Sequence, residues 1–185
     1  APRGGAEGTR SMHQTEFDPS PLTRIVRERD LVLVTGKGGT GKSTLVAALA
    51  ELAARQRGGA VAVEFSAHPR LPQMLGAGAL ARAVNIDAEQ VVGASLGRLL
   101  GVPALASMVL SNRIIRLFIR TSPAIREMIA LDELQHLVSE TSKQGFPVIV
   151  DATFLKRDWR DPFAALASEL ALPWFIAAAE ADPDV

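Results

Sequence analysis

Residues 36–44 read Gly36-Lys37-Gly38-Gly39-Thr40-Gly41-Lys42-Ser43-Thr44, which fits the pattern G-x-x-x-x-G-K-[ST]. Glycines let successive backbone N–H groups point inward at a dense anion such as a chain of phosphates. A helix that begins near Gly41 adds its unpaired N–H groups and the positive end of its dipole. The stretch therefore predicts a phosphate-binding loop, and all nine residues are candidate nucleotide-binding positions.

Two side chains of this loop suit ATP and Mg²⁺ as ligands. Lys42 can bring a mobile cation to the β and γ phosphates, and the Ser43 hydroxyl is placed to ligate Mg²⁺. The chain contains only four lysines against sixteen arginines, yet Lys37 and Lys42 both lie here. A compact ammonium suits a phosphate oxygen, so lysine usage favours a phosphate site. The alternative is a glycine-rich turn that serves packing alone.

Short apolar runs and one helical stretch surround the loop. Residues 31–34 read Leu-Val-Leu-Val, a pattern typical of a strand buried on both faces. Residues 41–57 carry apolar side chains at helical spacing and end at two glycines, and residues 60–65 are again short and apolar. The order strand, loop, helix, strand predicts a βαβ unit and an α/β fold with a doubly wound, mostly parallel sheet.

The middle of the chain predicts a helical insertion, at about residues 70–142. Asp87 and Gln90 fit a capping box, and residues 112–118 and 125–138 have apolar residues at three and four spacing. The pattern then changes. Three further elements are predicted: a strand at 146–151, a helix that begins at Asp161-Pro162, and a strand at 174–178.

Composition limits the classes of function. Basic and acidic residues number 20 each and there is no cysteine, which argues against whole-chain attraction to nucleic acid or an anionic membrane and excludes thiolate chemistry. Binding of that kind would need a local patch. The balanced charge predicts that the protein binds no nucleic acid. No apolar run is long enough to span a membrane, so we expect a cytoplasmic protein. Glycines and prolines predict a disordered leader at 1–20 before one domain at 21–185.

Lys37, near the start of the loop, makes the sequence more specific than the general phosphate-binding pattern. Residues 36–43 fit G-K-G-G-x-G-K-[ST], and residues 30–140 resemble the deviant Walker A P-loop ATPases of the arsenite-pump and tail-anchored-protein-targeting type. The resemblance implies a P-loop NTPase that hydrolyses ATP with Mg²⁺ as a nucleotide-dependent homodimer. It implies catalytic roles for Lys37 and Lys42, with Lys37 reaching the phosphates bound by the partner subunit.

The insertion is similar to that of the arsenite-pump-like branch, which implies a surface for a protein or anionic client. The segment has a basic bias, from Arg113, Arg116, Arg120 and Arg126. A solvated helix face is the alternative interpretation of these arginines. Because the chain lacks cysteine, a thiolate arsenite site is excluded.

The end of the second strand departs from this family. Where many members carry an aspartate that orients the attacking water, the alignment places Ser66. A hydroxyl is a poor base at neutral pH, so we expect slow hydrolysis. We interpret His68, two residues on, as a surface loop residue rather than a catalytic one.

A second resemblance begins after the insertion. Asp151 ends a buried strand and is a candidate catalytic acid and Mg²⁺ ligand, although an ordinary strand-terminating aspartate is the alternative. Residues 143–180 are more similar to small P-loop kinase modules. In both families the adenine-binding strand would lie beyond Val185, which predicts a domain truncated at its C-terminus. A slow ATPase, a small-molecule kinase and a nucleotide-binding module without turnover therefore all remain open.

Overall fold

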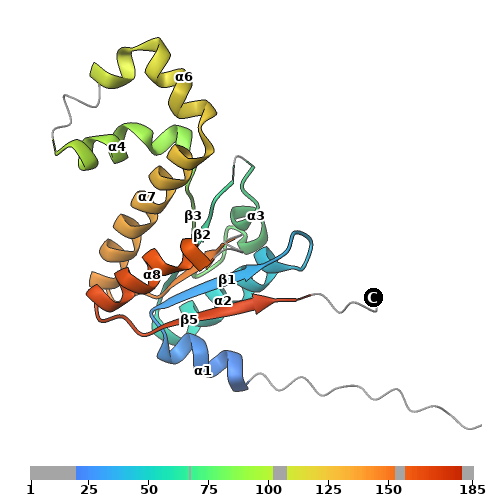
Figure 1. Cartoon of the computed structure of the whole chain (residues 1–185). Coiled ribbons are helices and arrows are strands. Elements are labelled where there is room, and N and C mark those ends of the chain that lie inside the picture. Colours follow the sequence, from blue (N-terminus) through green and yellow to red (C-terminus); the bar gives the residue numbers. More distant parts are fainter. Residues whose placement is uncertain (1–19, 67, 102–107, 153–156, 181–185) are drawn as a thin grey trace, which may run out of the picture.

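The computed structural model describes residues 20–66, 68–101, 108–152 and 157–180, and it is built on one parallel sheet (Figure 1). The five strands pair in the order β3-β2-β4-β1-β5. Their bounds are β1 Leu31–Gly36, β2 Ala60–Glu64, β3 Ala81–Asn85, β4 Val148–Asp151 and β5 Trp174–Ala179. Every pairing is parallel. The predicted α/β fold with a doubly wound parallel sheet is confirmed.

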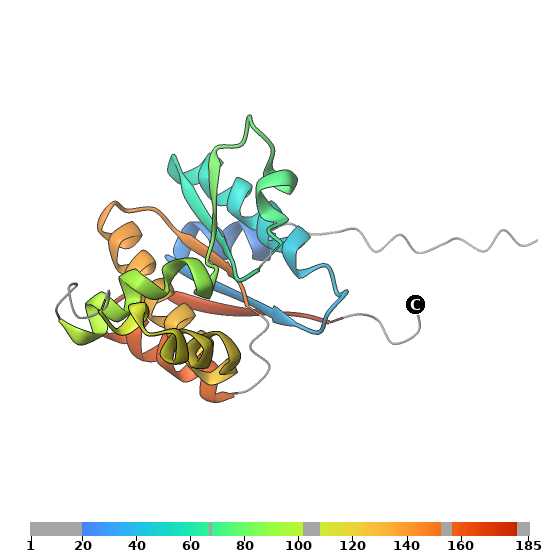
Figure 2. The ribbon, with the colours of Figure 1, turned by 90° about the horizontal axis from the view of Figure 1, so that it is seen from above.

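Helices cover both faces of this sheet. The described helices are α1 Ser20–Glu28, α2 Lys42–Arg57, α3 Leu71–Leu75, α4 Ala88–Leu100, α6 Arg113–Thr121, α7 Pro123–Lys143 and α8 Arg157–Glu169. In Figure 2 the blue and cyan helices α1 and α2 lie on one side of the sheet, and the orange and red helices α7 and α8 lie on the other. None of the described helices is long and apolar enough to cross a membrane.

Side chains of β1 point alternately to the two faces of the sheet and contribute to two hydrophobic cores. Val32 and Val34 pack with α2 in one cluster, whereas Leu31 and Leu33 pack with α7 and α8 in the other. All four side chains are at most 1% exposed. Successive strand residues point to opposite faces, so a strand covered on both sides needs apolar residues at every position. This is why the Leu-Val-Leu-Val run predicts a central strand.

The register of the strands brings their carboxyl ends to one edge. Asp151 is level with Val34 of β1 and with Glu64 of β2, and Glu64 is level with Asn85 of β3. Ligands of open parallel sheets gather at this edge. The phosphate-binding loop, which follows β1, therefore opens beside Asp151 and Glu64.

The prediction that residues 70–142 are wholly helical is wrong at one place. Strand β3 lies inside this range and pairs with β2 at the edge of the sheet. Its start is fixed by Glu51 of α2, whose Oε2 accepts hydrogen bonds from the N–H groups of Leu80 and Ala81 at 3.1 and 3.4 Å. A five-residue strand rich in alanine has little β propensity of its own, so this pairing with β2 and α2 decides its conformation.

Two helix boundaries also differ from the predictions. The helix expected to begin at Asp161-Pro162 begins at Arg157, so Pro162 lies inside α8. The missing N–H of a proline weakens a helix interior, but Phe163 and Ala167 are buried against the sheet and hold this helix in place. Helix α1 is an additional element that sequence analysis did not predict, and it packs on α2 through Val26.

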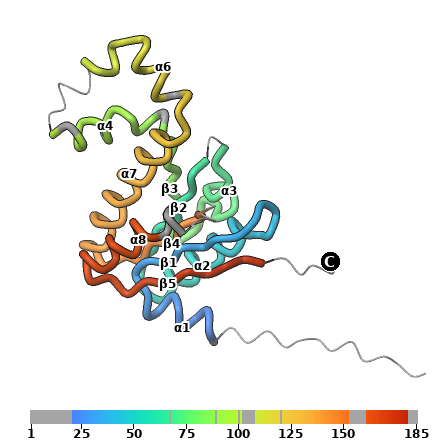
Figure 3. The backbone as a smooth tube through the Cα atoms, viewed as in Figure 1, coloured from blue at the N-terminus to red at the C-terminus, as the bar shows by residue number. Residues whose placement is uncertain are grey.

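Helices α4, α6 and α7 form an extension away from the sheet. The long helix α7 runs from the sheet to α6 at the far end (Figure 3). Helix α4 is tied to it because the hydroxyl of buried Ser95 donates to Asp132, and Arg98 pairs with Asp132 at 2.8 Å and with Glu133. The helix predicted after the Asp87 capping box is confirmed as α4.

Candidate nucleotide-binding site

The loop between β1 and α2 has a backbone that requires glycine at its entry. Gly36 has a φ of 146°, and a Cβ there would lie 2.3 Å from the carbonyl oxygen of Ala179. Gly41 is left-handed, with a φ of 78°, and its carbonyl accepts the N–H of Leu45 at 2.9 Å, the first bond of α2. The loop therefore turns sharply and presents the N-terminus of a 16-residue helix.

Lys42 is buried at the start of this helix. Its side chain is 7% exposed, and its Nζ donates a hydrogen bond to the carbonyl oxygen of Lys37 at 2.8 Å. The same carbonyl accepts the Thr40 hydroxyl at 2.9 Å. The contact that holds the Lys42 ammonium is thus a neutral carbonyl and not a carboxylate, which suits a cation that binds an anion.

Ser43 and Asp151 are in direct contact. The Ser43 Oγ donates a hydrogen bond to Oδ2 of Asp151, which ends β4. The two candidate Mg²⁺ ligands thus meet beside Lys42. The described residues contain no cluster of three or more acidic or histidine side chains that would hold a metal alone. One hydroxyl and one carboxylate fit Mg²⁺, which usually takes a few protein oxygens and completes its shell with phosphates and water.

A cleft of about 300 Å³ opens over these three side chains. Its lining consists of Lys42, Ser43, Glu64, Phe65, Ser66, His68, Arg70 and Asp151. The structure thus brings Lys42, Ser43 and Asp151 together as the sequence predicts. Lys37 is exposed on the loop and does not line this cleft. The glycines, Thr40 and Thr44 likewise are absent from the lining, although their loop forms the adjoining backbone.

Glu64 is a residue of the site that sequence analysis missed. Its carboxylate, 5% exposed, accepts the N–H groups of Arg70 and Leu71, each at 2.9 Å. These bonds anchor the loop after β2 over the cleft. The sequence does contain a pattern that could have identified Glu64. It follows the apolar run Ala-Val-Ala-Val, just as Asp151 follows the apolar residues of β4.

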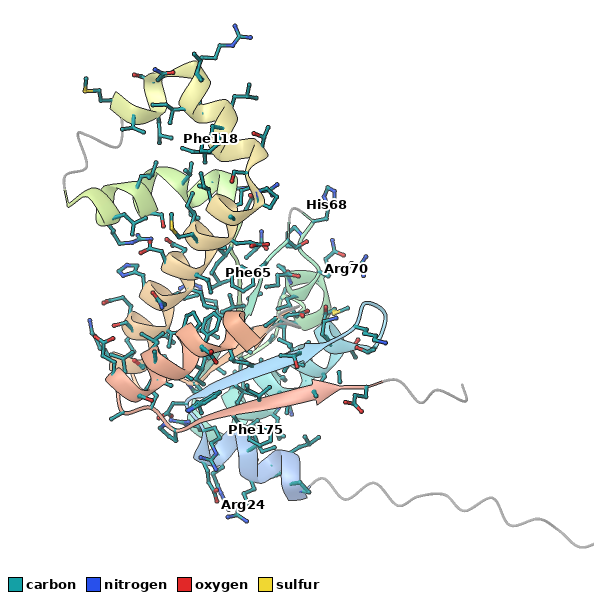
Figure 4. The ribbon with its side chains drawn as sticks, viewed as in Figure 1. Arg24, Phe65, His68, Arg70, Phe118 and Phe175 are labelled. Atoms are coloured by element: carbon teal, nitrogen blue, oxygen red, sulfur yellow. The ribbon has the colours of Figure 1, made fainter. Side chains whose placement is uncertain are left out.

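Ser66 is held against the edge strand. Its N–H donates to Oδ1 of Asn85 at 3.1 Å, and its carbonyl accepts Nδ2 of Asn85 at 2.8 Å. The Ser66 hydroxyl accepts the N–H of His68 at 2.9 Å. Figure 4 shows His68 and Arg70 on the loop after β2, and both side chains are exposed, His68 as predicted. Ser66 lines the same cleft as Lys42 and Ser43.

Comparison with known proteins assigns the family. A search of curated proteins finds no significant match. A family model described as an AAA domain matches residues 31–185, which is most of the chain. The match includes β1, the phosphate-binding loop and Asp151. This family has a P-loop NTPase-like fold and includes small kinases. The chain belongs to the AAA domain family and is a nucleotide-binding P-loop protein.

Proposed function

We propose that this protein is a slow ATPase that works as a nucleotide-controlled switch. The observation that carries the proposal is the convergence of Lys42, Ser43 and Asp151 in one cleft at the carboxyl ends of β1 and β4. The family match supports nucleotide binding, and the nature of the cleft supports ATP with Mg²⁺ as its ligands.

Each residue of the cleft has a role in this proposal. Lys42 neutralises charge on the β and γ phosphates, and the N–H groups of Gly38, Gly39 and Gly41 cradle them. Ser43 and Asp151 would hold Mg²⁺, which supplies further neutralisation of the phosphate charge. Preorganised charge of this kind stabilises the transition state because little has to move during the reaction.

The acids of the cleft favour hydrolysis over transfer to a substrate hydroxyl. A kinase usually presents a carboxylate that accepts the hydroxyl proton. In the described part of the chain the cleft has two carboxylates, and both have partners: Glu64 accepts two backbone N–H groups and Asp151 accepts Ser43. Hydrolysis needs no group that accepts a proton from a substrate hydroxyl, and without a carboxylate to orient water its attack would be slow.

A kinase is the second candidate, and the extent of the family match favours it. The match continues from β4 to residue 185, across the segment that resembles small kinase modules, and the family includes small kinases. A third possibility is binding without turnover, because Ser66 is a weak replacement for an aspartate.

The proposal extends to a homodimer and a client. Lys37 is exposed on the loop beside the cleft, which suits a residue that reaches the phosphates of a second subunit. The extension formed by α4, α6 and α7 is the surface that we assign to a protein or anionic client. Use of ATP fits a cytoplasmic location. The homodimer and the client rest on the resemblance of residues 30–140 to the deviant-loop ATPases.

Product analysis separates the candidates. Purified protein would be incubated with Mg·ATP alone and with a panel of hydroxylated small molecules, and both free phosphate and phosphorylated products would be measured. Phosphate release from ATP alone supports the ATPase. Phosphorylation of an added acceptor, with little release in its absence, would replace it with the kinase. Nucleotide binding with neither product would leave a binding module.

A further inference from the structure

Helix α6 exposes large apolar side chains at the end of the molecule far from the sheet. Ile114 is 78% exposed, Leu117 61% and Phe118 62%. Figure 4 labels Phe118 on this helix, well away from α1 and β5. Among the α6 side chains that the structure describes, only Ile119 is buried. One side of the helix therefore attaches it to the molecule, and the rest is open.

The exposed apolar residues form one stripe. Ile114, Leu117 and Phe118 follow each other at spacings of three and one, which places them on one face of a helix. The helix is formed in advance, because the Asn112 side chain caps it and accepts the N–H groups of Ile114 and Ile115 at 2.9 and 3.4 Å. A partner thus meets a preformed apolar face and need not order it.

The sequence on either side of this stripe carries charge of one sign as far as Glu127. Residues 91–126 contain no aspartate or glutamate but five arginines. Arg98 is paired with Asp132 and Glu133, whereas Arg113 and Arg116 are exposed at one turn from each other on α6. The chain as a whole is neutral, so the positive charge here is local. Arg113 and Arg116 therefore form a local basic patch, which a neutral protein needs in order to bind an anionic surface.

We propose that α6 binds the surface of an anionic lipid bilayer, independently of the nucleotide site. Ile114, Leu117 and Phe118 would enter the boundary between headgroups and acyl chains, and Arg113 and Arg116 would contact lipid phosphates. A basic amphipathic helix has this arrangement when it lies in a membrane interface. A second copy of the chain is disfavoured as the occupant because it would bring the same arginines against these.

The experiment uses the absence of cysteine in the chain. Leu117→Cys would be labelled with an environment-sensitive fluorophore, with Leu80→Cys as the matched control, since Leu80 is 62% exposed and lies at the start of β3. The vesicles are phosphatidylcholine alone or with one third phosphatidylglycerol. We expect a blue shift at position 117 with the anionic vesicles only, and no shift at position 80.

A second experiment tests the contribution of the α6 arginines to binding. Arg113→Gln together with Arg116→Gln should weaken binding to the anionic vesicles about thirtyfold, since each arginine near such a surface contributes about fivefold. Arg27→Gln with Arg82→Gln, two exposed arginines away from α6, should change it by less than about threefold. Added salt should reverse binding of the parent protein.

Three results would overturn the proposal. The first is a label at position 117 that stays in water with anionic vesicles while circular dichroism shows a folded protein. The second is a blue shift that depends on protein concentration without lipid, which assigns the face to a second copy. The third is a shift produced only by a soluble apolar helical peptide, which assigns it to a protein partner.

Discussion

Ser43 and Asp151 share a hydrogen bond although 108 positions separate them in the chain. Ser43 lies in the first turn of α2, and Asp151 ends the neighbouring strand β4. The bond exists because β1 and β4 pair in parallel with Val34 level with Asp151. The hydroxyl and the carboxylate that would hold Mg²⁺ are therefore adjacent in the fold.

The first prediction concerns this pair. Asp151→Asn keeps an oxygen acceptor near Ser43 but removes the charge that attracts Mg²⁺. We expect the gain in ATP affinity that Mg²⁺ provides to fall by about tenfold, while affinity without Mg²⁺ changes little. Calorimetric titrations with and without Mg²⁺ measure this gain. Asp161→Asn, at an exposed position on α8, is the control and should behave as the parent.

The second prediction concerns the weak point of the proposed ATPase. Ser66→Asp restores a carboxylate beside the cleft, and general base catalysis of this kind contributes about 100-fold or more. We expect phosphate release to accelerate by at least about tenfold. Ser66→Asn, which has the same shape without the charge, should remain slow. Equal rates for the Asp and Asn variants would show that position 66 does not orient water.

The third prediction concerns the exposed lysine of the loop. In a dimer with nucleotide bound between the subunits, the Lys37 ammonium neutralises phosphates bound by the other subunit. Nucleotide binding and dimerisation are therefore thermodynamically coupled. Mg·ATP should shift the parent toward a dimer in sedimentation velocity, and Lys37→Ala should lose that shift but retain nucleotide binding. Lys143→Ala, an exposed lysine of α7, is the control. A parent that stays monomeric at saturating ATP would favour the kinase.

The fourth prediction is a pH dependence at the start of β3. Burial opposes ionisation of Glu51, but hydrogen bonds from the Ala81 N–H, Arg55 and the Leu80 N–H outweigh it and lower the pKa of this carboxyl. A lowered pKa means that the ionised carboxyl stabilises the fold above its ordinary pKa of about 4.3, and that this contribution is lost as the pH falls through the lower folded value.

Amide exchange at Leu80 and Ala81 reports this loss. Corrected for the intrinsic pH dependence of exchange, their protection should fall in acid in the parent. In Glu51→Gln it should be low throughout and independent of pH. Glu140→Gln, whose carboxylate contacts Lys143 on α7, should leave both amides as in the parent. Protection that falls in acid equally in Glu51→Gln would assign the change to another group.

The parts of the molecule that the sequence predicts are those with strong local signals. Leu31, Val32, Leu33 and Val34 predict a strand covered on both faces because every position is apolar. The spacing from Gly36 to Ser43 predicts the loop, because few sequences allow that backbone. Asp151 is recognisable because it follows three buried apolar residues, and parallel pairing then brings it to Ser43.

The parts that sequence analysis missed depend on contacts that reach beyond a single helix or strand. Strand β3 is short and alanine-rich, and its conformation depends on β2 and on Glu51. Glu64 looks like any acid at the end of a strand until the chain returns and its carboxylate accepts the N–H groups of Arg70 and Leu71. The Glu64 bonds span six and seven residues and the Glu51 bond to Leu80 spans 29, so the pattern within one helix or strand does not reveal them.

The most direct measurement is a calorimetric titration of Lys42→Ala with Mg·ATP, beside the parent and Lys143→Ala. Lys42 is the buried cation of the cleft, and a hydrogen bond to a charged group contributes about 1.5–3 kcal/mol, or roughly 10- to 150-fold in affinity. We predict that the parent and Lys143→Ala bind Mg·ATP alike and that Lys42→Ala binds it at least about tenfold more weakly, while remaining folded. Equal affinity in all three proteins would contradict the assignment of this cleft to nucleotide phosphates.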